Sequence, residues 1–238
     1  MGIRDKNIYN KIKRNNPYFE DFITRSVYHS NAIEGNTLSY AETYAIIFND
    51  NSMKVRAKPR ELYEAINLKY VMDFILKTLE EEVSIDYIKK IGMLINQNIN
   101  EISGFRTAPV YIVGSEHIPP EAPYVPQLLM EMLYRSRVDD IHSDIFERAA
   151  DMHIRFERIH PFSDGNGRTG RALLTKELLK EGYAPVVVSV DDKAEYIDLL
   201  ARQDVISLAS FIRKLSEEEE ARMNRFGINL HAKTDSDM

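Results

Sequence analysis

The stretch HPFSDGNGRTGR, residues 160–171, gathers three of the ten glycines and one of the six histidines of the chain into twelve positions. An acid, an amide and two arginines complete it, and the arginines stand three positions apart at the start of a helical pattern. Turns favour glycine because its backbone is permissive. Turn formation alone does not explain the two arginines. The stretch is therefore either a turn that happens to carry charged residues or a site that binds an anion.

The residue types of this stretch suit chemistry on phosphates. His160 can accept a proton at neutral pH, and Asp164 offers the oxygen ligand that Mg²⁺ prefers. Residues 165–167 can expose successive backbone N–H groups at the N-terminus of a helix, where an anion binds well. Arg168 and Arg171 share one face of that helix. Together these residues predict phosphoryl or nucleotidyl transfer.

Outside this loop the chain is predicted to be almost entirely helical, because apolar residues recur with the 3.6-residue period. The segments are 18–35, 39–48, 61–79, 85–98, 126–138, 143–159, 171–182, 193–203 and 205–223. Ser39 and Glu42 have the spacing of a capping box, and Gly35 and Gly182 stand where a glycine ends a helix. Beyond Asn224 the polar tail is expected to fray.

One segment departs from the helical pattern. Residues 108–126, APVYIVGSEHIPPEAPYVP, combine a β-branched and aromatic run with a turn and a proline-rich exit. The pattern predicts one small β-hairpin over about 109–118 on an otherwise all-α protein. Because a lone hairpin is only marginally stable, it is expected to lie against the helices.

Composition narrows the class of protein. The chain has 238 residues, with 44% hydrophobic and 29% charged residues, a net charge of −6 and no cysteine. It is long enough for a single globular domain with an extension, and it lacks both a thiol nucleophile and a disulfide framework. No apolar run approaches the roughly 18 residues of a membrane span. We therefore expect a cytoplasmic protein that binds neither membrane nor nucleic acid.

At this point a resemblance to a known family is plain. HPFSDGNGR followed by Arg171 matches the Fic signature, His-x-Phe-x-Asp/Glu-Gly-Asn-Gly-Arg-x-x-Arg, at every defined position. Residues 104–120 resemble the family's flap with its preceding Gly-x-Arg, and the sequence from about 85 to 215 resembles the family's helical core. The resemblance implies a Fic-type helical bundle with a core over 61–215, an N-terminal helical extension over 1–60, and a C-terminal helix end and tail over 216–238.

The resemblance also implies an activity and its residues. Such enzymes move AMP from ATP to a Ser, Thr or Tyr hydroxyl of a protein, here with self-modification expected as well. His160 would be the general base and Asp164 would hold Mg²⁺. The expected ATP-binding residues are Gly165, Asn166, Gly167, Arg168, Thr169, Gly170, Arg171 and Tyr196, and the flap residues expected to pair with the target are Ile112, Val113, Gly114 and Ser115.

Two of these assignments have alternatives. Tyr196 resembles a family aromatic that packs on adenine, yet a tyrosine on an amphipathic helix is equally a core residue. The polar residue expected about seven positions later is not clearly assigned, since Gln203 and Asp204 both fit. The exposed edge of the flap would hold an extended target segment by main-chain hydrogen bonds, whereas the alternative is a purely structural hairpin.

A second match lies near the N-terminus. In SVYHSNAIEGNTLS, Ser30 and Glu34 lie four apart near the end of a helix and match the family's inhibitory motif, Ser/Thr-x-x-x-Glu-Gly/Asn. The expected effect is an ion pair between Glu34 and Arg171 that competes with the γ-phosphate. Two other functions stay open: removal of AMP by the same site, and a non-catalytic module that binds ATP and partners. Relatives of this architecture often form dimers, which leaves a homodimer open.

Overall fold

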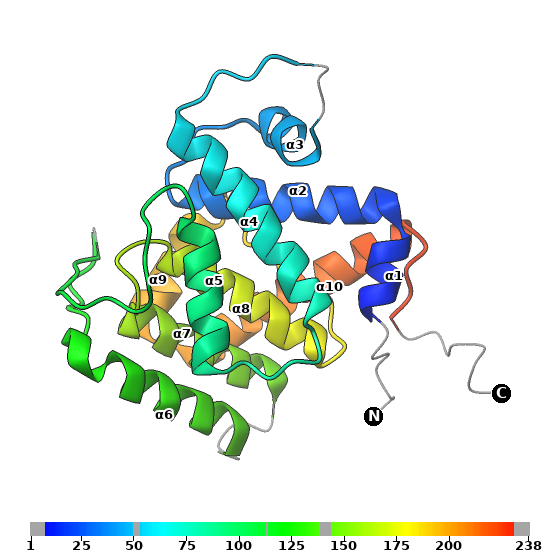
Figure 1. Cartoon of the computed structure of the whole chain (residues 1–238). Coiled ribbons are helices and arrows are strands. Elements are labelled where there is room, and N and C mark those ends of the chain that lie inside the picture. Colours follow the sequence, from blue (N-terminus) through cyan, green and yellow to red (C-terminus); the bar gives the residue numbers. More distant parts are fainter. Residues whose placement is uncertain (1–7, 50–52, 113, 139–143, 231–238) are drawn as a thin grey trace.

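The computed structural model describes residues 8–49, 53–112, 114–138 and 144–230, and these residues form ten α-helices and one 3₁₀ turn (Figure 1). The elements are α1 (Ile8–Arg14), α2 (Asn16–Ile33), α3 (Tyr40–Phe48), α4 (Pro59–Lys77), α5 (Ile85–Asn96), η1 (Ala122–Tyr124), α6 (Val125–Val138), α7 (Ile145–Ile159), α8 (Asn166–Lys180), α9 (Lys193–Arg202) and α10 (Val205–Arg225).

The helices are arranged around α7 and α8, which pack against each other. Helix α7 also contacts α6 and α10, while α8 also contacts α2, α4 and α5. The buried apolar side chains form two clusters, one that includes Phe22, Ile88 and Phe162, and a second that includes Phe146 and Tyr196. None of the helices in the described part of the chain is long and apolar enough to cross a lipid bilayer.

Several helix ends form as the sequence predicts. Ser39 and Glu42 make a reciprocal capping box at the start of α3, which satisfies backbone N–H groups that the helix itself cannot pair. Gly35 follows α2 with φ 92°, and Gly182 follows α8 with φ 75°. Both angles lie in the left-handed region, where glycine has no steric penalty. These local predictions are confirmed.

Two parts of the fold differ from the sequence expectation at the chain ends. Helix α1 was not predicted, although Ile8 and Ile12 recur at helical spacing and are both fully buried. The expected fraying beyond Asn224 is wrong for residues up to 230, because Ile228 and Leu230 are 4% and 1% exposed. The apolar side chains of α1 and of residues 228–230 belong to the same buried cluster. Both segments therefore remove apolar surface from water, which stabilises them in the fold.

The predicted hairpin is a correction to the fold class. Among the described residues of 109–118 no strand is present, and Val113 lies outside the described residues. Tyr111 and Ile118 are 80% and 72% exposed. Because these large side chains do not pack on the helices, a two-stranded ladder would lack the apolar support that an isolated hairpin needs. The described protein is therefore all-α without the β-hairpin.

Candidate active site

The loop between α7 and α8 is pinned by its apolar and amide side chains. Phe162 is fully buried, and its ring fills the space beside Gly92 of α5, where a Cβ would lie 2.3 Å from the ring. The Oδ1 atom of Asn166 accepts from the main-chain N–H of Phe162 (2.8 Å), and its Nδ2 donates to the carbonyl of Phe162 (2.8 Å). The side chain of Asn166 therefore fixes the loop, and the backbone N–H of Asn166 is left for an anion.

The start of α8 has the form of an anion site. Gly165 precedes the helix with φ 78°, a left-handed conformation that glycine adopts without strain. The first hydrogen bond of the helix runs from the N–H of Thr169 to the carbonyl of Gly165 (3.0 Å). The N–H groups of residues 166–168 precede that bond, so they have no partner within the helix and favour an anion together with the helix dipole.

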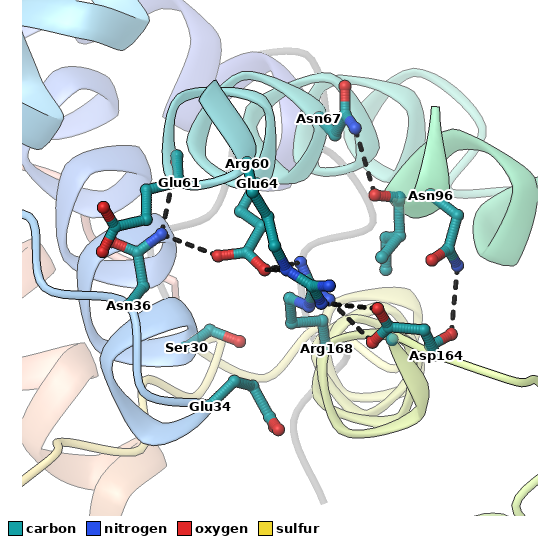
Figure 2. Close-up of polar contacts among 12 residues, drawn as sticks. Ser30, Glu34, Asn36, Arg60, Glu61, Glu64, Asn67, Asn96, Asp164 and Arg168 are labelled. Carbon is teal, nitrogen blue, oxygen red and sulfur yellow. Dashed lines mark hydrogen bonds and ion pairs between the residues drawn. The ribbon is translucent and has the colours of Figure 1, made fainter. Parts of the chain in front are cut away.

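Arg168 lies at this N-terminus and is almost completely buried, at 2% exposure. Its guanidinium is 3.3 Å from a carboxylate oxygen of Asp164 and 3.5 Å from one of Glu64 on α4 (Figure 2). Two of its nitrogens, Nε and Nη1, are buried without a hydrogen-bond partner in the described part of the protein. Buried donors of this kind are costly unless an acceptor reaches them.

Arg171, one turn further along α8, faces α2 and is also buried. Its Nε donates to the hydroxyl of Ser30 (2.9 Å), and its Nη2 donates to the carbonyl of Ser30 (2.9 Å) and to the carboxylate of Glu34 (2.7 Å). Burial alone would lower the pKa of Arg171, but the charge of Glu34 raises it. Ser30 and Glu34 therefore both contact Arg171, and the hydroxyl of Ser30 bonds the arginine.

The carboxylate of Glu34 also lies against the N-terminus of α8. Its Oε1 is 2.2 Å from the point where a Cβ on Gly167 would stand, so the glycine makes room for it. Burial alone would raise the pKa of Glu34, yet the charges of Arg171, Arg168 and Lys193 hold the pKa below its usual value. An ionised carboxylate of the chain itself thus stands at the anion site.

Asp164, the expected metal ligand, has arginines on both of its oxygens. Arg60 of α4 donates to Oδ2 (2.6 Å) and Arg168 approaches Oδ1, while Asn96 of α5 holds the carbonyl of Asp164 (3.0 Å; Figure 2). Sequence reasoning missed Arg60 and Glu64. Their only local signal is the spacing of four on one helix, which is typical of many solvated ion pairs.

A magnesium site built from protein ligands alone does not occur in the described ranges, where no group of three His, Cys, Asp or Glu side chains gathers. Asp164 has a side chain that is 26% exposed and lies beside the anion site. A single carboxylate of this kind fits Mg²⁺, because this ion commonly takes one or two carboxylates and fills its shell with phosphate oxygens and water.

His160 ends α7 in a left-handed conformation, with φ 49°. Its Nδ1 is 3.2 Å from the carbonyl of Glu157; since a carbonyl only accepts, Nδ1 carries the proton and Nε2 keeps a lone pair. Burial is the main cause that lowers the pKa of His160. The imidazole is therefore neutral near pH 7, as a general base requires.

Three of the expected ATP-binding residues lie where helices pack against one another: Thr169, Gly170 and Tyr196. The hydroxyl of Thr169 bonds the carbonyl of Gly165 (2.9 Å), and a Cβ at Gly170 would stand 2.2 Å from a carboxylate oxygen of Glu157 on α7. Tyr196 of α9 is 1% exposed, and its hydroxyl lies 2.7 Å from His153 Nε2. This is the core position that the sequence left open, so contact with adenine stays a prediction.

Glu157 is a titratable group that sequence reasoning missed. One of its carboxylate oxygens is buried without a hydrogen-bond partner in the described residues. Burial raises the pKa of Glu157 to about 7, while the charge of Arg171 lowers it and that of Glu34 raises it. Its position in the sequence, on a charged helix, gives no sign of this burial.

The segment expected to be the flap forms a loop in its described residues. Ser115 donates its N–H to the carbonyl of Ile112 (3.1 Å), and Gly114 between them has φ 80°. These residues lie in the exposed loop, and their pairing with a target stays a prediction. His117 of this loop contacts α7, because its Nε2 donates to the carbonyl of Arg158 (2.9 Å).

Comparison with known proteins gives consistent matches. The model of the Fic/DOC family matches residues 82–178. The protein adenylyltransferase fic-1 of Caenorhabditis briggsae is 34% identical over 208 residues, and the protein of the same name from Caenorhabditis elegans is 33% identical. Each match covers 84% of this chain but 40% of the relative, so the chain spans about two fifths of the length of these relatives.

Solved structures agree in fold. Residues 134–508 of Fic-1 from C. elegans superpose with a TM-score of 0.71 at 30% identity, covering 92% of this chain and 72% of that one. A Fic-domain-containing signaling protein from Bacteroides thetaiotaomicron has a TM-score of 0.79 at 21% identity, with 94% and 93% covered. The second likeness concerns the fold alone.

Proposed function

This chain belongs to the Fic/DOC family, and from that premise we propose that it transfers AMP from ATP to a hydroxyl of a protein target, with itself among the targets. The names of the curated relatives, protein adenylyltransferase, support this chemistry. The observation that carries the proposal is the anion site at the start of α8. Among the described residues, N–H groups without a partner in the helix and the buried donors of Arg168 lie there, one short loop away from a neutral histidine.

In the proposed reaction the hydroxyl oxygen of the target attacks the α-phosphorus of ATP. The bond from this phosphorus to the bridging oxygen breaks, and pyrophosphate leaves. The hydroxyl proton goes to Nε2 of His160, which Nδ1 keeps oriented through the carbonyl of Glu157. Arg168 and Arg171 neutralise charge on the phosphates, and the N–H groups of residues 166–168 bind their oxygens.

Asp164 is the residue that would hold Mg²⁺. When bound, the ion neutralises charge on the phosphates and orients them. Arg60 competes for the same carboxylate through its 2.6 Å contact. We therefore propose that Arg60 must give up this contact when Asp164 takes part in the reaction.

We further propose that the N-terminal extension, residues 1–60, restrains the reaction. Glu34 contacts Arg171 at 2.7 Å and lies against Gly167. A phosphate group would need the same arginine and the same N–H groups, so carboxylate and phosphate exclude one another. The loop after Glu34 supports this position, because Asn36 donates to the carboxylate of Glu64 (2.8 Å; Figure 2).

The experiment incubates the Glu34→Gly variant with a cell lysate and with ATP labelled on either the α- or the γ-phosphate, followed by mass spectrometry of the labelled proteins. Incorporation of the α label alone, lost in His160→Ala, supports AMP transfer. Incorporation of the γ label would contradict it and indicate a kinase. Loss of AMP from pre-modified proteins would identify the reverse activity, and nucleotide binding without either change would identify a binding module.

A further inference from the structure

Arg106 is a buried charge that the proposed reaction does not use. It follows the glycine at position 104 in the segment between α5 and η1, and it is 6% exposed. Among the described residues it forms no ion pair, and all of its side-chain hydrogen bonds go to backbone carbonyls. A buried guanidinium without a carboxylate is unusual, and the absence of a counter-charge shows in its pKa, which burial lowers.

One set of contacts joins Arg106 to the residue proposed as the base. Its Nε donates to the carbonyl of His160 (2.8 Å) and its Nη2 to the carbonyl of Ile159 (3.3 Å). Its main-chain N–H donates to the carbonyl of Pro161 (2.9 Å). Ile159 is the last residue of α7, and His160 and Pro161 follow it directly, so these three consecutive carbonyls have no partner within the helix. A cation there is also favoured by the helix dipole.

A second set of contacts joins Arg106 to both ends of the segment 107–120. Its Nη1 donates to the carbonyl of Ala108 (3.3 Å), and its Nη2 also donates to the carbonyl of Pro120. No β-ladder closes this segment in its described residues. The guanidinium therefore joins the two ends of the loop to each other and to the end of α7.

We propose that Arg106 is a positioning residue. It fixes the backbone of His160, the proposed general base, and it joins the two ends of the segment 107–120. One guanidinium would thus hold the general base and the loop proposed to face the target in a fixed position relative to each other. The inference deepens the proposed function, since it concerns the base of that reaction. The planar fork of arginine suits this role because it presents five donors in fixed directions.

The charge of Arg106 has a separate consequence for His160. Burial lowers the pKa of His160 most, the charges of Arg106 and His117 lower it further, and the carbonyl of Glu157 and the charge of Glu34 raise it. A positive charge disfavours the imidazolium form. Removal of the charge of Arg106 should therefore raise the pKa of His160. The imidazole would then become protonated, and stop acting as a base, at a higher pH.

Three variants separate the fork from the charge. Arg106→Gln loses both, whereas Arg106→Lys keeps the charge but loses the fixed fork. Arg155→Gln is the matched control, because it removes one positive charge from α7, the helix whose end Arg106 contacts, at a position where Arg155 pairs with Asp151 (2.7 Å). The pKa of His160 is measured by NMR of its ring, assigned with His160→Ala, and the opening of residues 107–120 by hydrogen exchange.

In Arg106→Gln we expect the pKa of His160 to rise by about 0.5–1 pH unit and the exchange of residues 107–120 to accelerate about tenfold or more. Arg106→Lys should keep the pKa near that of the unmodified protein but still accelerate exchange, and Arg155→Gln should change neither. If transfer is observed, the acidic limb of the kcat/KM profile should move with the pKa of His160.

Neither main measurement requires AMP transfer, so failure of the proposed function would leave this test intact. Unchanged exchange in both Arg106 variants, with the protein folded, would overturn the positioning role. An unchanged pKa of His160 in Arg106→Gln would overturn the electrostatic role. Global unfolding of Arg106→Gln leaves Arg106→Lys to decide the positioning role, and exchange like that of the unmodified protein in that variant would reject it.

Discussion

Replacement of Glu34 by glycine removes the carboxylate that contacts Arg171. The contact is a charged hydrogen bond of 2.7 Å, and such bonds contribute about 1.5–3 kcal/mol. The side chain of Arg171 is 9% exposed but that of Glu34 is 38% exposed, so solvent screening reduces the effect to roughly 1–2 kcal/mol. If ATP must displace this carboxylate, transfer should rise about 5- to 30-fold.

The assay is incorporation of AMP from α-labelled ATP at subsaturating nucleotide, with ATP affinity measured by calorimetry. Glu34→Gln separates loss of charge from added flexibility at the helix end, and it should give most of the gain. Glu20→Gln is the control, because Glu20 lies on the same helix and bonds Asn16 (2.8 Å). The pKa of Glu34 lies below its usual value, so the gain should be the same at pH 6.5 and pH 8.

Two results would refute this reasoning. An unchanged rate in a folded, ATP-binding Glu34→Gly variant would mean that Glu34 is only the end of a helix. A gain that persists after addition of Arg171→Ala would mean that the released arginine is not what the nucleotide requires. Ser30→Ala should give a smaller gain, since it removes one hydrogen bond from Arg171 to an uncharged hydroxyl and leaves the contact of Arg171 with the carboxylate of Glu34 in place.

Four further outcomes are expected. His160→Ala should abolish AMP transfer while calorimetry still detects binding of Mg²⁺–ATP, because the base acts on the incoming hydroxyl; lost nucleotide affinity would contradict that role. Asp164→Ala should remove most transfer together with its dependence on Mg²⁺, and equal rates in chelator and in Mg²⁺ would argue against a metal. The pKa of Glu157 is raised to about 7, so the folded state holds a proton that the unfolded state releases above about pH 4.5. This group therefore lowers the free energy of unfolding as pH rises. Between pH 5 and pH 8, the free energy of unfolding of Glu157→Gln, measured with urea, should increase by about 2–3 kcal/mol relative to that of the unmodified protein. Gly92→Ala should lower the free energy of unfolding by about 1–3 kcal/mol, because its Cβ would stand 2.3 Å from the ring of Phe162, and an unchanged urea midpoint would show that the ring moves freely.

Local sequence patterns determined most of the helices of this protein. The capping box at Ser39, the glycine at 35 and the apolar period of each segment act through hydrogen bonds and contacts within a few residues, so they are legible without a fold. The loop of residues 160–171 is of the same kind, because its glycines, acid and arginines lie within three turns of one another. The contact of Glu34 with Arg171 was expected from the family resemblance and is present, although its two residues lie 137 positions apart.

Tertiary structure alone decided which side chains complete the site. Arg60 reaches Asp164 across 104 positions, and Arg106 reaches His160 across 54. Arg60 has no sequence feature that sets it apart from a solvated arginine. The Gly-x-Arg pattern before the flap singles out Arg106 but does not show its contacts, because the acceptors that give each arginine its role come from other elements. The prediction of a hairpin was wrong because it rested on local propensity alone. Residues 109–118 have strand-forming side chains, but strand propensity yields a ladder only where a neighbouring surface buries one face. In the described fold Tyr111 and Ile118 find no such surface, and burial, unlike propensity, is fixed only once the helices have packed.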